Sequence, residues 1–133
     1  MGVLLLFVDG IGLGDADPEI NPLARARVSR LRLFRDCASP DPAAFLVPTD
    51  ACMGVPGLPQ SATGQTSLLA GLNAPAAVGR HINGYCTKSL AALLDGRSLF
   101  SRVKAAGRDA TFANAYTPGF LEKPPRFLSV TTI

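Results

Sequence analysis

The chain has 133 residues, is 47% hydrophobic and carries a formal net charge of +3. That length suits one domain, residues 1–133, with enough apolar side chains for a buried core. The longest early apolar run, Val3 to Val8, is too short for a membrane span or a signal-peptide core, and Asp9 interrupts it. We therefore expect a soluble, cytoplasmic protein with no membrane partner.

The first nine residues predict a buried strand that ends in an acidic residue. The sequence GVLLLFVDG, residues 2–10, is continuously apolar up to Asp9, as is typical of a central parallel strand covered on both faces. Ligands of open α/β sheets bind at the carboxyl ends of such strands, so Asp9 is a candidate ligand for a divalent cation. A plain turn or capping aspartate is the alternative at this position.

The next segment predicts a helix over residues 22–37, with Asn21 as its N-cap and Pro22 as its first residue. Five of the thirteen basic residues lie between Arg25 and Arg35. Because only one aromatic residue, Phe34, interleaves with them, we interpret this run as a solvated helix face and expect no nucleic-acid partner. Residues 44–47 predict a short second strand.

Glycines and prolines then predict a loop over residues 50–60, followed by a helix over residues 62–72. Gly71 and the sequence Asn73, Ala74, Pro75 are interpreted as the stop of this helix. Ser61 accordingly lies at or just before a helix N-terminus. Further helices are predicted over residues 89–94 and 98–106, and a strand over residues 109–116. This order predicts an α/β fold, a mostly parallel sheet flanked by helices. The β-branched run at residues 129–133 leads us to expect an incomplete sheet whose native chain continues.

Two common motifs fail on their spacing. Gly10, Gly12 and Gly14 follow a predicted strand, but the dinucleotide motif GxGxxG would require glycine where the chain has Asp15. The GxSxG elbow of serine hydrolases is absent around Ser61. The three cysteines, Cys37, Cys52 and Cys86, lack metal-site spacing, so we expect them to be reduced and buried.

The opening LLFVDGIGLGD resembles the first strand and metal aspartate of the alkaline phosphatase superfamily. It is most similar to the branch of cofactor-independent phosphoglycerate mutase and phosphopentomutase, whose nucleophile lies in a segment of the form NSEVGH or TxTGH. The matching letters here are QSATGQ, residues 60–65. The resemblance covers only the N-terminal portion of such an enzyme.

A second branch of the superfamily, the nucleotide pyrophosphatase type, supports the same register. Its nucleophilic threonine precedes the glycine of a TG pair by ten positions, and ten positions before Gly71 is Ser61. Both alignments select Ser61 over Thr63 and Thr66. A simple N-cap serine is the alternative. Gln65 stands where the mutases have histidine, so a compact metalloenzyme of the branch fits better than a mutase.

The resemblance implies a metal-dependent phosphatase, phosphodiesterase or phosphomutase acting on a small phosphorylated substrate. Two divalent cations, Zn²⁺ or Mn²⁺ or else Mg²⁺, would be held in part by Asp9 and Ser61, and Ser61 would form a phosphoserine. Thr63 and Arg80 are candidate substrate contacts.

The family draws most of its metal ligands from a C-terminal half, and this chain has one histidine, His81. We expect His81 to contact backbone in a loop, and we expect this chain alone to bind metal weakly and to turn over little or nothing. The alternative is a non-catalytic remnant that binds a phosphorylated ligand or a partner. An open sheet edge would favour self-association.

Overall fold

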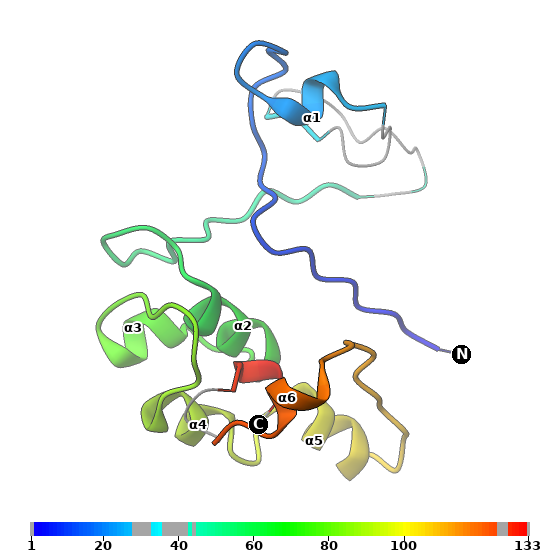
Figure 1. The fold of residues 1–133 in the computed structure, drawn as a ribbon, viewed down its shortest axis with the longest axis vertical. Coiled ribbons are helices and arrows are strands. Elements are labelled where there is room, and N and C mark those ends of the chain that lie inside the picture. The colour runs from blue at the N-terminus through cyan, green and yellow to red at the C-terminus, as the bar shows by residue number, and fades with distance from the viewer. Residues whose placement is uncertain (1, 28–32, 36–42, 44, 125–127, 133) are drawn as a thin grey trace. The chain divides into compact units, whose positions relative to one another are not determined.

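The computed structural model describes residues 2–27, 33–35, 43, 45–124 and 128–132. The chain divides into two compact units, Met1–Thr49 and Asp50–Ile133, and each is described here by itself. The elements, shown in Figure 1, are α1 (Pro22–Arg25), α2 (Ser61–Ala70), α3 (Ala74–Val78), α4 (Lys88–Leu94), α5 (Leu99–Ala105), α6 (Pro118–Leu121) and the 3₁₀ helix η3 (Val130–Thr132).

The predicted α/β fold with a parallel sheet is wrong. In the described part of the chain, strand pairing is limited to one parallel bridge between Gly14 and Phe34, and Arg35 N donates to Gly14 O at 3.0 Å beside it. The apolar run expected to be a central strand is exposed, from 92% at Val3 to 44% at Val8. A strand needs neighbours that complete its hydrogen-bond ladder, and apolar composition alone does not provide them.

Among the described residues of the first unit, the helix predicted over residues 22–37 is present only as its first turn. Asn21 caps α1 as expected, because its side chain accepts a hydrogen bond from Leu23 N at 3.0 Å. The helix ends at Arg25, and residues 33–35 are not helical. Residues 28–32 and 36–37 of this prediction lie outside the described residues. So does residue 44 of the strand predicted over 44–47, and residues 45–47 form no strand.

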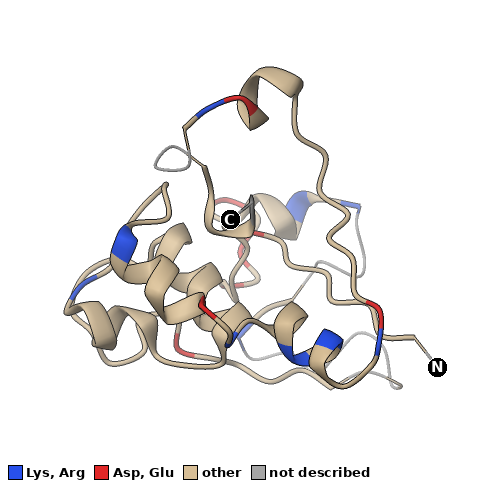
Figure 2. Ribbon diagram, turned by 90° about the horizontal axis from the view of Figure 1, so that it is seen from below, with Lys and Arg blue, Asp and Glu red and all other residues tan. Residues whose placement is uncertain are grey.

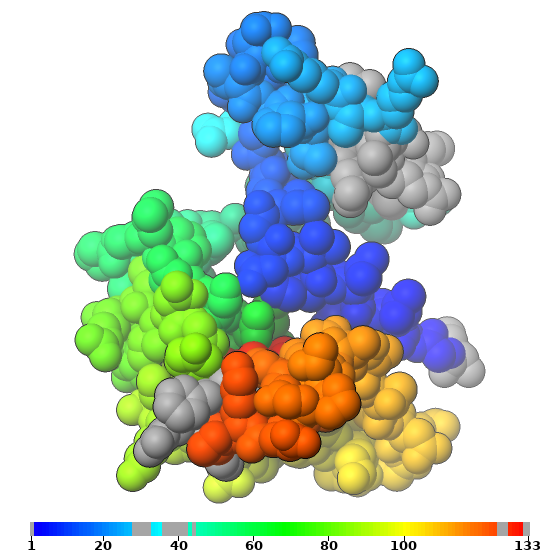
Figure 3. All heavy atoms as spheres, in the orientation of Figure 1, coloured from blue at the N-terminus to red at the C-terminus, as the bar shows by residue number. Residues whose placement is uncertain are grey.

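The second unit is built around α2, which packs against α3, α4, α5 and η3. Its small buried core consists of Ala62, Ala74, Cys86, Leu90 and Val130, and partly buried leucines and isoleucine surround it. Figure 3 shows the side chains of this unit, from green to red, packed together. Because the face that α2 buries is made of small residues, its neighbours can approach closely.

The helices of the second unit agree with the sequence far better than the strands do. α2 lies within two residues of the predicted range 62–72, and Gly71 follows it in the left-handed conformation at φ 68°. α4 and α5 confirm the helices predicted over 89–94 and 98–106. The strand predicted over 109–116 is wrong, since these residues belong to no strand. α3 and α6 were not predicted.

The described cysteines are free. Cys86 is buried, as expected, and burial raises the pKa of its thiol, so it remains protonated and packs as a small apolar side chain. Cys52 is partly exposed, and Cys37 lies outside the described residues.

Charged residues are interspersed along the ribbon (Figure 2). Within the basic run of the first unit, Arg25 pairs with Glu19 at 3.0 Å and Arg35 lies 4.0 Å from Asp15, with all four side chains well exposed. Among the described residues, none of the helices has the length and apolarity that crossing a membrane requires.

Candidate functional site

Ser61 is the first residue of α2. Gln60 holds the N-cap position, with an extended backbone at φ −132° and ψ 147°, and its side chain makes no capping hydrogen bond. Ser61 is therefore not the N-cap residue of α2, contrary to the alternative interpretation. Ser61 is partly exposed, at the positive end of the dipole of a ten-residue helix.

The segment around Ile82 lies directly against the start of α2. Ile82 O accepts hydrogen bonds from Ala62 N at 3.1 Å and from Thr63 N at 3.3 Å. This backbone contact satisfies two of the first-turn amides that have no partner inside the helix. An anion beside Ser61 would therefore meet the helix dipole but not these two N–H groups.

Thr63 has no exposed surface, and its hydroxyl is used inside the chain. Its Oγ1 donates to Gln60 O at 3.2 Å and accepts from Ile82 N at 3.3 Å. Through these two hydrogen bonds, the Thr63 side chain connects the start of α2 to Gln60 in the preceding loop and to Ile82. Its predicted role as a substrate contact stays a prediction.

Arg80 and His81 occupy the short segment that leads to Ile82. Arg80 is exposed and precedes Ile82 by two residues in the sequence. His81 Nε2 lies 3.1 Å from Val55 O, which confirms the expectation that His81 contacts backbone in a loop.

The loop over residues 50–60 is ordered by hydrogen bonds and contains no helix or strand, as predicted. Asp50 accepts from Cys52 N at 2.9 Å and from Gly54 N at 3.3 Å, which folds the loop into a turn with Met53 and Gly54 at positive φ. Asn73 Nδ2 donates to Met53 O at 2.8 Å. This bond and the contact between His81 and Val55 O hold the loop that leads to Ser61.

Asp9 belongs to the first unit, whereas Ser61, Thr63 and Arg80 belong to the second. Asp9 is exposed and opens a turn with Gly10, whose φ is 76°. In the part of the chain that the structure describes, no three residues among Asp, Glu, His and Cys gather as metal ligands would. The two-cation centre stays a prediction from the resemblance alone.

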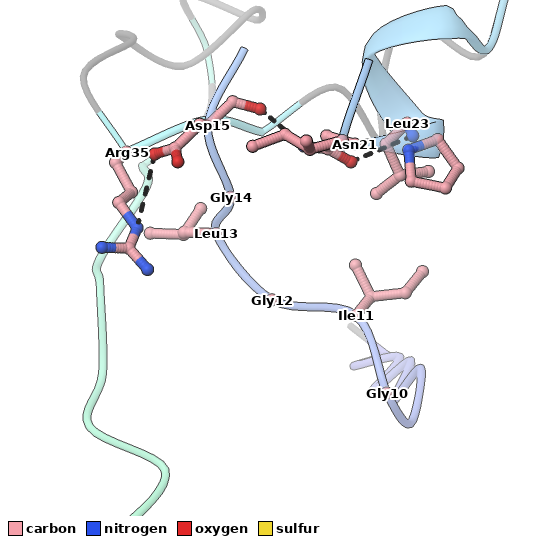
Figure 4. A pocket seen from close by; sticks show the side chains of 11 residues that line it. Gly10, Ile11, Gly12, Leu13, Gly14, Asp15, Asn21, Leu23 and Arg35 are labelled. Carbon is pink, nitrogen blue, oxygen red and sulfur yellow. Dashed lines mark hydrogen bonds and ion pairs between the residues drawn. The ribbon is translucent and has the colours of Figure 1, made fainter. Parts of the chain in front are cut away.

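The glycines after Asp9 line a shallow concavity of about 540 Å³ within the first unit (Figure 4). Asn21 Nδ2 donates to Asp15 O at 2.7 Å across it, and Arg35 lies beside Asp15. A Cβ atom on Gly14 would lie 2.9 Å from Asn21 Nδ2, so this glycine permits the close approach of Asn21. The glycines thus shape the turn that precedes α1.

The chain matches no family model, no curated protein and no solved structure.

A polar cluster that the sequence did not predict lies near the C-terminal end of the second unit. Tyr116 Oη lies 2.8 Å from Thr131 Oγ1 and 3.4 Å from Ser129 Oγ, and it accepts from Asn114 Nδ2 at 3.2 Å. Burial raises the pKa of Tyr116, but these hydrogen bonds outweigh it and leave the pKa below its ordinary value. The run SVTT was the available signal, but residues thirteen and fifteen positions apart are joined only by folding.

Gln65 is the other polar residue that the sequence did not single out as a contact. It lies one helical turn after Ser61, and its Oε1 atom is buried without a hydrogen-bond partner among the residues that the structure describes. Its only signal in the sequence was a departure from the histidine of the resembling family.

Proposed function

We propose that the chain acts in phosphoryl transfer from a small phosphorylated substrate, with Ser61 as the residue that accepts the phosphoryl group. The observation that carries the proposal is the place of Ser61 as the first, partly exposed residue of α2. Ile82 O is hydrogen-bonded to the amides of the next two residues, and Arg80 precedes Ile82 by two residues in the sequence. The resemblance of residues 60–65 to a nucleophile segment supports the same residue.

The chemistry follows from this placement. Ser61 Oγ would form a bond to phosphorus as the bond from phosphorus to the leaving oxygen breaks, and the serine proton would pass to the leaving oxygen or to solvent. Water or a second hydroxyl would then break the Oγ–P bond, which gives hydrolysis or transfer. The helix dipole and the guanidinium of Arg80 would favour the negative charge of the phosphoryl group.

Divalent cations, if bound, would polarise the phosphoryl oxygens and lower the pKa of the attacking hydroxyl. The described donors do not gather into such a centre, so no step is assigned to a cation. The activity assay should therefore be run without metal and with Zn²⁺, Mn²⁺ or Mg²⁺ added in turn.

Replacing the nucleophile tests the proposal. We expect Ser61→Ala to lower the rate of nitrophenyl phosphate hydrolysis by about a thousandfold or more, because no other group replaces the attacking oxygen. Acid quenching of wild type with substrate should trap one phosphoryl group on the peptide that contains Ser61, as read by mass spectrometry.

Ser89→Ala is the matched control, since Ser89 is an exposed serine in the first turn of another helix, α4. It should leave both rate and trapped phosphoserine unchanged. A Ser61→Ala protein that keeps its rate and still traps phosphate would remove Ser61 from the mechanism.

A second candidate function, partner binding without catalysis, is favoured by a different observation. The apolar residues from Val3 to Val8 are exposed, and a contiguous exposed apolar segment is characteristic of an interaction surface. Absence of phosphoserine together with concentration-dependent association would favour this candidate.

A further inference from the structure

A concavity of about 700 Å³ lies within the second unit, beside α4 and α5. That volume falls in the range of about 300–1,000 Å³ that small-molecule sites occupy. Its apolar lining includes Leu69 of α2, Leu94 of α4 and Val130 of η3. Phe100 and Phe112 add two aromatic rings. The concavity therefore offers an apolar surface to part of a ligand.

The two rings indicate what kind of apolar group fits best. Phe100 and Phe112 meet edge to face, with their centroids 6.0 Å apart and their planes at 88°. Phe112 is 40% exposed, so part of its ring remains open to a further partner. Because aromatic rings attract one another in edge-to-face and offset-stacked arrangements, this wall favours an aromatic group over an aliphatic one.

Polar residues three positions apart form another side of the same concavity. Ser98 is the N-cap of α5, and Ser101 and Lys104 follow it at the spacing that places residues on one helix face. The Oγ atoms of the two serines lie 2.9 Å apart. Asp95, the residue that ends α4, also lines the concavity, three positions before Ser98. This side therefore combines two hydroxyls with two charges of opposite sign.

The opposite charges restrict the ligand further. Asp95 and Lys104 are both exposed, and Lys104 carries its ammonium group on a flexible four-carbon stem that can adjust to a ligand. A ligand with a single charge would gain one attraction and meet one repulsion at this side. A ligand with an ammonium and a carboxylate can pair with both residues. The charges therefore favour a zwitterion.

We propose that this concavity binds a free amino acid with an aromatic side chain. The α-ammonium group is held by Asp95, the α-carboxylate by Lys104, and the side chain lies against the ring of Phe112. The inference does not depend on the proposed phosphoryl transfer, because the residues that carry it lie at the end of α4, along α5 and at position 112.

Three matched compounds test the zwitterion requirement by titration calorimetry on the full chain. L-Phenylalanine has both charges, phenethylamine lacks the carboxylate, and 3-phenylpropionate lacks the amine. Wild type should bind L-phenylalanine about tenfold more tightly than either of the others, since each of them loses one charge-assisted contact.

Two variants assign the charges. Lys104→Met should bind L-phenylalanine and phenethylamine equally, because the carboxylate no longer has a partner. Asp95→Asn should bind L-phenylalanine and 3-phenylpropionate equally, for the corresponding reason at the amine. Lys88→Met and Asp109→Asn are the matched controls, since both residues are exposed and neither lines the concavity. The controls should keep the wild-type preferences.

The aromatic wall is tested by Phe112→Leu. This variant should lose affinity for L-phenylalanine by about fivefold and leave the weaker binding of L-leucine unchanged, because the contact between two rings is replaced by an aliphatic one. No binding of L-phenylalanine by wild type, equal affinities for the three matched compounds, or preferences that survive in Lys104→Met and Asp95→Asn would overturn the inference.

Discussion

Two threonine hydroxyls are completely buried in α2 and are hydrogen-bonded within the chain. Thr66 Oγ1 donates to Ala62 O at 2.8 Å, a bond confined to the helix. Thr63 Oγ1 instead bonds outside the helix, donating to Gln60 O and accepting from Ile82 N. Thr63 is therefore the polar link that holds the approach to Ser61, whereas Thr66 only satisfies its own hydroxyl.

Replacing these hydroxyls with methyl groups should give unequal results. Thr63→Val removes the hydroxyl that accepts a hydrogen bond from Ile82 N, so we expect the free energy of unfolding to fall by about 1–3 kcal/mol. Thr66→Val should change it by less than about 1 kcal/mol, since the bond it loses is local to the helix. Urea denaturation followed by circular dichroism measures both.

The same pair tests the predicted substrate contact of Thr63. If Thr63→Val has normal stability but weaker binding of inorganic phosphate, its hydroxyl faces a ligand and not residue 82. A loss of stability with unchanged phosphate affinity supports the structural role.

Local signals at single residues explain why α1 was located at its correct start and α3 was missed. Asn21 followed by Pro22 was interpreted as a helix start, and Asn21 is the N-cap of α1. The sequence Asn73, Ala74, Pro75 contains nearly the same signal, but we interpreted it as the stop of the preceding helix. It is both: Asn73 Oδ1 accepts from Ala76 N at 3.0 Å, and α3 begins at Ala74.

At the scale of elements, Asn73 joins α3 to the loop over residues 50–60. Its Oδ1 caps α3, while its Nδ2 donates to Met53 O at 2.8 Å. One side chain therefore serves two elements that lie twenty residues apart in sequence.

Separating these two bonds is possible by mutation. Asn73→Ala should lower the free energy of unfolding by about 1–2 kcal/mol, because both the cap and the loop contact are lost. Asn73→Ser keeps a capping oxygen and loses the bond to Met53. Its free energy of unfolding should therefore be higher than that of Asn73→Ala, by the contribution of the cap. Hydrogen exchange of the amides near Met53 should be faster in both variants. Unchanged exchange in both would mean that Asn73 does not hold the loop.

Helices were predicted well and strands were not, for a physical reason. A helix completes its hydrogen bonds within one segment, so Gly71 as a stop and Ser98 as an N-cap act locally and are visible in the sequence. A strand depends on partners elsewhere in the chain. Residues 3–8 and 109–116 have the right composition, but neither is paired in the structure.

At the scale of the whole molecule, apolar residues differ greatly in how far they are buried. Leu90 is fully buried beside α2, whereas the run from Val3 to Val8 in the first unit is exposed. Such a run combines apolar, β-forming side chains with an absence of charge and proline, which is typical of segments that pair with other chains.

We expect the chain to self-associate through this run. Replacing Leu4 and Leu6 together by lysine should weaken association by about tenfold or more, because like charges would face one another across the contact. Leu58 and Leu121, which are exposed leucines of the second unit, give a control with the same added charge when both become lysine. Sedimentation velocity over a range of concentrations distinguishes the variants. A wild-type monomer at every concentration would contradict the expectation.

The sequence by itself determined the helices around Ser61, the irregular loop before them and the loop position of His81. These features depend on caps, glycines and prolines that act within a few residues. The sequence shows Gln65, but only the structure shows that its Oε1 atom is buried and has no hydrogen-bond partner among the described residues.

Only the tertiary structure decided that the predicted sheet is absent from the described residues. It also decided that Ile82 O accepts hydrogen bonds from two first-turn amides of α2 and that Thr63 is buried. Each of these depends on which distant segments meet. Residues 63 and 82 are nineteen positions apart, and no local pattern encodes their contact. Pairing and burial are properties of the folded chain, because the free energy that selects them is shared among segments that the sequence keeps apart.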